Sequence, residues 1–101
     1  MRIKAGDSVP VTLDLNADLT GASSVLCKVM RAVTGVFAFS IAATVTDADD
    51  GLISFTPTAL QTAVPGAYFV ETKVTFAGGA IQTFPGSSYN EIVIDAAAPA
   101  V

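Results

Sequence analysis

Residues 64 to 81, which decide the fold, read V-P-G-A-Y-F-V-E-T-K-V-T-F-A-G-G-A-I. After Pro65 and Gly66, two sets of side chains alternate. One set is Tyr68, Val70, Thr72, Val74 and Phe76, and the other is Ala67, Phe69, Glu71, Lys73 and Thr75. This period of two, rather than 3.6, predicts a half-buried β-strand. Because Gly78 and Gly79 readily adopt positive φ, as a primed turn requires, we expect a hairpin turn there.

The same alternation recurs in short segments separated by turn residues. Strands are predicted at residues 8–16, 24–32, 36–46, 52–56, 67–76, 80–84 and 89–95. The predicted strand at 36–46 has eleven residues, which is long for one strand, so a bend or crossing is expected near Ala42. One short 3₁₀ or helical turn is predicted near residues 57–63, with Pro57 at its first position. About seven short strands without a long helix are typical of an all-β, antiparallel β-sandwich.

The composition indicates one small domain with a thin polar surface. At 101 residues the chain is expected to form a single domain over residues 1–95, with a loose C-terminal tail at 96–101. Charged residues make up only 14% of the chain, against about 25% in typical soluble domains. Leu26 and Met30, or the opposite face of their strand, and one of the two alternating sets around Phe69 are expected to face away from the core, as in an interface.

Charge and targeting patterns exclude several partners. The net charge is −4 and the five cationic residues are scattered, whereas nucleic-acid binding needs a basic stripe. No apolar run is long enough for a membrane span. The start, M-R-I-K-A-G-D-S-V-P, lacks the apolar region of a signal peptide, so synthesis in the cytoplasm is expected.

Candidate chemistry is sparse. The chain has no histidine, which removes the usual general base and the usual zinc ligand, so no catalytic, cofactor-binding or metal-binding residue is predicted and the chain is not expected to be an enzyme. A carboxylate pair among Asp14, Glu71 and Glu91 is the remaining catalytic alternative, although carboxylates on polar strand faces are usually just solvated. Cys27, the single cysteine, is interpreted as a small buried hydrophobe, with a reactive thiol as the alternative.

One acidic loop has two interpretations. Asp47, Asp49, Asp50 and Gly51 resemble the start of an EF-hand loop, but Thr58 stands where the bidentate glutamate should fall. Because Asp and Gly are also standard residues of a tight β-turn, a turn at Asp50-Gly51 is favoured. Calcium binding by Asp47, Asp49 and Asp50 stays open at this point.

The residues Leu60, Pro65, Gly66 and Tyr68 have the spacing of a tyrosine corner. In such a corner the tyrosine hydroxyl bonds back to the backbone a few residues upstream and links the two sheets. The alternative is an ordinary half-buried tyrosine. If the corner forms, Tyr68→Phe should cost on the order of 1 kcal/mol.

Five segments together resemble a family of tailed-phage structural proteins. They are K-A-G-D-S-V-P-V (4–11), D-L-T-G-A-S-S-V (18–25), V-T-D-A-D-D-G-L-I-S-F (45–55), V-P-G-A-Y-F-V-E-T-K-V-T-F-A-G-G (64–79) and I-Q-T-F-P (81–85). In this order they are similar to the immunoglobulin-like N-terminal domain of phage baseplate upper proteins and to related small virion domains. The resemblance covers residues 4–94.

The resemblance implies an immunoglobulin-like fold and a non-enzymatic structural or accessory role in a phage virion. It implies many copies, docked on capsid, tail or baseplate proteins, and a location in the virion after synthesis in the host cytoplasm. Homo-oligomeric or multi-copy assembly is expected, with neither nucleic acid nor membrane as a partner. Because the sequence stops at Val101, a free-standing accessory piece is expected.

The alternative function is a soluble adhesion or carbohydrate-binding β-sandwich module. Such a module would be expected to display a line of exposed aromatic side chains. The chain has no tryptophan and only two tyrosines, Tyr68 and Tyr89, so it offers few aromatic side chains for such a line.

Overall fold

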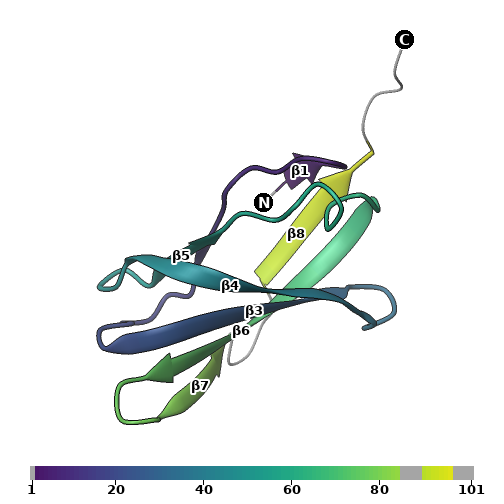
Figure 1. Cartoon of the computed structure of the whole chain (residues 1–101). Helices are drawn as coiled ribbons and strands as arrows, with labels where there is room; N and C mark the ends of the chain where they lie inside the picture. Colours follow the sequence, from purple (N-terminus) through teal and green to yellow (C-terminus); the bar gives the residue numbers. More distant parts are fainter. Residues whose placement is uncertain (1, 85–89, 97–101) are drawn as a thin grey trace.

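The computed structural model describes residues 2–84 and 90–96, which form eight strands (Figure 1). They are β1 (Arg2–Lys4), β2 (Val11–Asp14), β3 (Ala22–Arg31), β4 (Phe37–Asp47), β5 (Leu52–Phe55), β6 (Gly66–Phe76), β7 (Ile81–Phe84) and β8 (Asn90–Asp95). The seven predicted strands correspond to β2 through β8, and β1 was not predicted. The largest difference in length is at the first predicted strand, 8–16, of which only Val11–Asp14 pairs.

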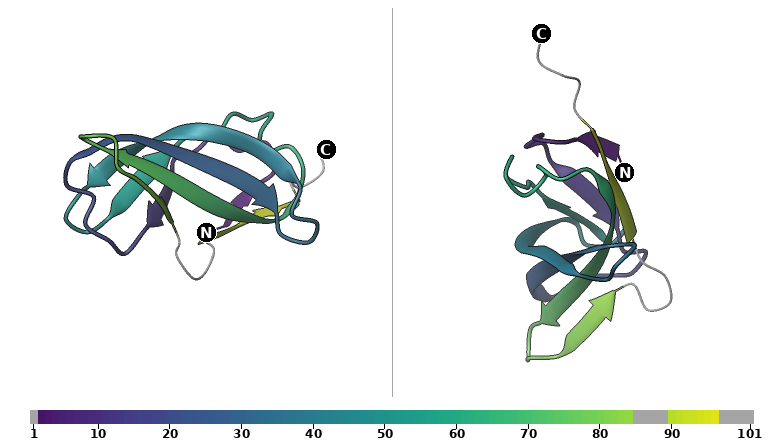
Figure 2. Two further views of the ribbon diagram at one scale, coloured as in Figure 1. Left: turned by 90° about the horizontal axis from the view of Figure 1, so that it is seen from below. Right: turned by 90° about the vertical axis from the view of Figure 1, so that its right-hand side faces the viewer.

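The strands form one curled sheet in the order β1-β8-β6-β3-β4-β5-β2, with β7 paired to β6. Neighbouring strands are antiparallel except β1 and β8, which are parallel. Between residues 43 and 44, β4 changes partner from β3 to β5, close to the bend expected near Ala42. This change lets the sheet fold over on itself into two layers (Figure 2). The predicted all-β, immunoglobulin-like sandwich is confirmed.

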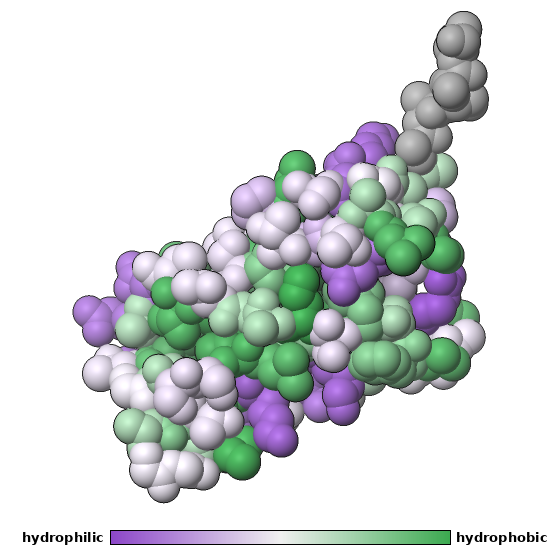
Figure 3. Space-filling view, in the orientation of Figure 1, coloured by the Kyte–Doolittle hydropathy of each residue, from purple (hydrophilic) through white to green (hydrophobic). Residues whose placement is uncertain are grey.

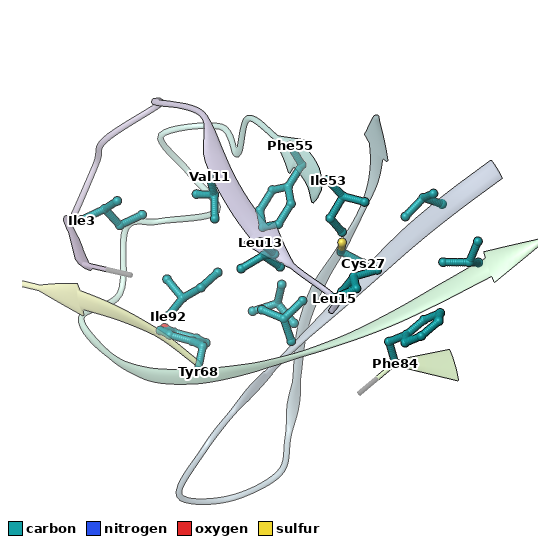
Figure 4. Packing of buried hydrophobic residues seen from close by; sticks show 14 of the residues in the cluster. Ile3, Val11, Leu13, Leu15, Cys27, Ile53, Phe55, Tyr68, Phe84 and Ile92 are labelled. Atoms are coloured by element: carbon teal, nitrogen blue, oxygen red, sulfur yellow. The ribbon is translucent and has the colours of Figure 1, made fainter. Parts of the chain in front are cut away.

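The core lies between the two layers and takes one face of nearly every strand. Cys27, Ile53 and Val70 are each fully buried in it. Figure 4 shows Cys27 of β3 beside Ile53 of β5, while Tyr68 of β6 lies beside Ile92 of β8. By contrast, no residue of β4 is fully buried: its inward residues, from Phe39 to Val45, are only half-buried. One side of the sandwich is therefore less completely covered than the other.

Three glycines in two turns have the positive φ that these turns require. Gly78 and Gly79, in the loop between β6 and β7, both have positive φ, 92° and 93°. Gly51 has φ 73° and lies against the backbone of Ala17, where a Cβ atom would collide with the Ala17 carbonyl oxygen. Asp50 is in the same turn, and its amide donates to Asp47 Oδ1 at 3.2 Å.

The short 3₁₀ or helical turn predicted near residues 57–63 is present as a hydrogen-bonded turn over residues 59–62. The Thr62 amide donates to the Thr58 carbonyl at 3.3 Å, and the Thr62 hydroxyl donates to the Asp7 carbonyl at 2.8 Å. This second bond ties the turn to the segment before β2, which favours one tight turn over further helix. The described residues contain no helix able to span a membrane.

The predicted tail at residues 96–101 lies, apart from Ala96, outside the described residues. The assignment of residues 1–95 to a single domain stays a prediction.

Candidate functional site

A cavity of about 410 Å³ opens between the end of β3, the start of β4 and the 60–64 segment. Its lining residues are Arg31, Ala38, Phe39, Leu60, Gln61, Val64 and Tyr68. We call this cavity the Arg31 pocket. Its volume falls within the range of about 300–1,000 Å³ that is common for small-molecule sites. The walls are mainly apolar, with one guanidinium group among them, so the pocket combines hydrophobic contact with a fixed positive charge.

The position of Arg31 is set by Tyr68, its partner across the β3–β6 pair. Arg31 Nη1 donates to Tyr68 Oη at 3.1 Å, and Arg31 Cζ lies 5.4 Å from the centre of the tyrosine ring. The Tyr68 hydroxyl in turn donates to the Val64 carbonyl at 2.7 Å. This chain of contacts orients the guanidinium, while the ring adds a favourable cation–π contact.

Arg31 has no carboxylate partner within residues 2–84 and 90–96. The ion pair in that part of the chain joins Arg2 Nη1 to Asp95 Oδ1 at 2.6 Å. Because an arginine carries five N–H donors, and Tyr68 accepts from one of them, several donors are available to a ligand. The Arg31 pocket is therefore complementary to a negatively charged or oxygen-rich group.

Gly66 forms a backbone wall behind the guanidinium. Its φ is 147°, and a Cβ atom added there would lie 3.2 Å from Arg31 Nη2. A side chain at this position would strain the backbone and displace Arg31. Glycine at residue 66 thus allows the close approach of the arginine.

The residues predicted to form a tyrosine corner lie around this pocket. The bond from Tyr68 Oη to the Val64 carbonyl is the kind of bond that a tyrosine corner uses. Pro65 and Gly66 lie between its two ends, whereas Leu60 is 85% exposed at the edge of the pocket. That Tyr68 forms a tyrosine corner stays a prediction.

Arg31 was missed by sequence reasoning, although a signal was present. The predicted strand placed Val25, Cys27 and Val29 on its inward face, and the next residue in that alternation is Arg31. A cation in line with a buried face is unusual, because such residues are rarely buried without a partner. That anomaly, rather than a motif, would have pointed to this end of the strand.

The remaining candidates for chemistry do not form a site. Cys27 is fully buried with Sγ 3.6 Å from Thr72 Oγ1, and burial raises the pKa of its thiol. The interpretation of Cys27 as a buried hydrophobe is confirmed. Asp14 Oδ1 accepts from the Asn16 amide, and Glu71 lies opposite Lys28 in the β3–β6 register.

The donor set of the chain does not fit a transition-metal site. Copper and zinc sites in proteins use imidazole and sulfur ligands, often with a carboxylate. The chain has no histidine, its single cysteine is buried in the core, and among the described residues Met30 alone carries a thioether. No group of three or more His, Cys, Asp or Glu side chains gathers anywhere in residues 2–84 and 90–96.

Apolar side chains also reach the surface, as expected from the composition. Leu26 is 42% exposed and Phe37 is 56% exposed, while Met30 and Phe69 are half-buried. Figure 3 shows a band of hydrophobic residues across the middle of the face on which β3 and β4 lie.

Comparison with known proteins shows similarity in fold. No family model matches the sequence, and no curated protein matches it. Among solved structures, the crystal structure of CopC from Methylosinus trichosporium OB3b is similar over 99% of this chain and 87% of that chain. The sequence identity is 16% and the TM-score is 0.56, so the likeness establishes a shared fold.

The resemblance to tailed-phage baseplate domains is wrong. A solved structure that matches nearly the whole chain is CopC, and no model of the phage family matches. The expectations drawn from that resemblance are corrected with it. These are the structural or accessory role in a virion, the capsid, tail or baseplate partners in many copies, and the virion location. The five quoted segments consist of turn residues and alternating strands, which any β-sandwich can share.

Proposed function

We propose that this chain is a non-enzymatic ligand-binding β-sandwich domain whose ligand binds in the Arg31 pocket. The observation that carries this proposal is the arrangement of Arg31 itself. Its guanidinium group lies in the wall of a mainly apolar cavity, is oriented by Tyr68, and has no carboxylate partner in the described part of the chain.

A partly covered cation without a counter-ion is costly unless something else satisfies it. Arg31 is half-buried, and its one hydrogen bond to a side chain leaves other N–H donors to water or to a ligand. A ligand that accepts these hydrogen bonds would also displace water from Phe39 and Val64. Because Tyr68 already restrains the arginine, little side-chain entropy is lost on binding.

The absence of catalysis in this proposal rests on the available side chains. The whole chain lacks histidine, so no Ser-His or Cys-His pair exists. The Cys27 thiol is buried and its pKa is raised, so it is a poor nucleophile at neutral pH. Neither carboxylates nor thiols line the Arg31 pocket.

The proposal is tested by NMR titration of the ¹⁵N-labelled protein with a set of small aromatic acids, aromatic amides and aliphatic alcohols. At least one fragment should shift the amide signals of Arg31, Phe39 and Gln61. The loop between β6 and β7, which includes Gly78 and Gly79, serves as the internal control and should not respond. If no fragment shifts the pocket signals, or if the shifts gather only elsewhere, the proposed binding site is wrong.

A further inference from the structure

Resting on the proposed function, we infer that the ligand of the Arg31 pocket is a carboxylate carried on a small apolar or aromatic body. Two independent properties of the pocket favour such a ligand. One is the geometry of its single cation, and the other is the chemistry and size of its walls.

The cation is a guanidinium group and the pocket holds one of them. An arginine presents a planar pair of N–H donors that matches the two oxygens of a carboxylate, with charge-assisted hydrogen bonds at both. Arg31 Nη1 also donates to Tyr68 Oη, which fixes the plane of that pair. A single positive charge balances the single negative charge of a carboxylate.

A phosphate group would be a poorer match. Phosphate groups carry up to two negative charges and are usually bound by several cations or by backbone amides. On β3, the nearest cation in sequence is Lys28, which is exposed and belongs to the opposite face of the strand. It is absent from the lining of the Arg31 pocket.

The walls select an apolar body next to the carboxylate. The cavity is lined by the apolar side chains of Phe39, Leu60 and Val64. Gln61 carries the side-chain amide of the lining, and its Oε1 accepts from the Thr58 backbone amide. A cavity of about 410 Å³ accommodates a small ring or a branched aliphatic group beside the acid. The same chemistry occurs in free organic acids and at the C-terminal residue of a peptide, so the experiment distinguishes these sources.

Calorimetric titration with 3-phenylpropanoate and with its neutral analogue 3-phenylpropanamide tests the carboxylate. The acid should bind about tenfold or more tightly than the amide, because a hydrogen bond to a charged partner is lost in the amide. In Arg31→Gln the affinity for the acid should fall to that for the amide, whose own affinity should barely change. Raising the salt concentration should weaken binding of the acid alone.

Two further variants guard the result against misfolding. Arg2→Gln changes the other arginine of the chain, on β1 and away from the pocket lining, and should leave both affinities unchanged. Leu60→Glu alters a side chain that is 85% exposed at the pocket edge, so it should preserve the fold and weaken binding of the acid by repulsion. Unfolding midpoints of all variants establish that they are folded at the titration temperature.

The outcomes separate the inference from the proposed function. If the amide binds as tightly as the acid, or if Arg31→Gln leaves the preference intact, the carboxylate inference is overturned while binding in the pocket stands. If no aromatic acid of the set binds but an amide or an alcohol shifts the pocket signals, the inference is overturned and the proposed function survives. If nothing shifts these signals, both fail.

The source of the carboxylate is decided by a peptide pair. The tripeptide Gly-Gly-Phe with a free C-terminus is compared with the same peptide carrying a C-terminal amide. Binding of the free peptide about tenfold more tightly than 3-phenylpropanoate, with loss in the amide, supports a peptide C-terminus as the natural source. Weaker binding of the peptide than of the small acid supports a free organic acid.

Discussion

Two cross-strand polar contacts lie four residues apart on the same β3–β6 pair, yet their surroundings differ completely. Cys27 is paired with Thr72, both are fully buried, and their side chains meet at 3.6 Å in the middle of the sandwich. Arg31 is paired with Tyr68 and meets it at 3.1 Å beside the open pocket. Position along one strand pair therefore decides whether a polar contact is enclosed in the core or available to a ligand.

The physical reason is that the second layer covers the sheet more completely at Cys27 than at Arg31. At Cys27 the sheet is covered by β5, whose Ile53 lies beside the sulfur (Figure 4). At Arg31 the cover is the irregular 60–64 segment, which includes the exposed side chains of Leu60 and Val64. Substitutions at these positions test the contrast between the enclosed Cys27–Thr72 contact and the open Arg31–Tyr68 contact.

The largest effect is expected when a negative charge is placed at each position in turn. Cys27→Asp buries an unpaired carboxylate and should cost about 3–5 kcal/mol, a large part of the stability of a small domain. Arg31→Asp places the same group at the half-exposed end and should cost far less. Urea unfolding followed by circular dichroism measures both, and equal losses would contradict the contrast.

Tyr68→Phe should lower the free energy of unfolding by about 1–2 kcal/mol. The hydroxyl donates to the Val64 carbonyl and accepts from Arg31, so its loss removes both hydrogen bonds. The same urea experiment measures the change. An unchanged midpoint would argue against the tyrosine corner, since the hydroxyl would then add nothing to stability.

Alkaline pH should destabilise the protein because it ionises the buried thiol of Cys27. Burial raises the pKa of Cys27 above the ordinary value of 9.0, so the folded state binds the thiol proton more tightly than the unfolded state. Stability from this group is complete below that value and is lost as the pH rises above it. The fall in urea midpoint from pH 7 to 10 should be smaller in Cys27→Ala, and parallel curves would refute the burial argument.

The smallest effect is expected for Thr72→Val, with a change of about 0.5 kcal/mol or less. The Thr72 hydroxyl meets a thiol, which is a weak hydrogen-bond partner, so the buried Cys27 thiol loses little when the hydroxyl is removed. This variant therefore serves as the matched control for Tyr68→Phe. A loss as large as that of Tyr68→Phe would show that the enclosed contact is also energetically important.

Most strands could be predicted because their information is local. In β6 the alternation from Ala67 to Phe76 is visible in the chain, and in β3 the same pattern places Cys27 inward. By contrast, β1 has three residues and pairs in parallel with β8, about 90 residues away, for which no local pattern exists. The candidate site was predictable only in part, since Tyr68 was singled out and Arg31 was not.

The sequence by itself determined that the chain forms strands, where most of them begin and end, and that histidine-based chemistry is excluded. These properties follow from side-chain alternation, turn residues and composition, which act over a few residues. Only the tertiary structure decided that Arg31, Phe39, Leu60 and Tyr68 meet around one cavity. They come from four separate segments, and the curl of the sheet at β4, together with the 60–64 segment, brings them within reach of one ligand.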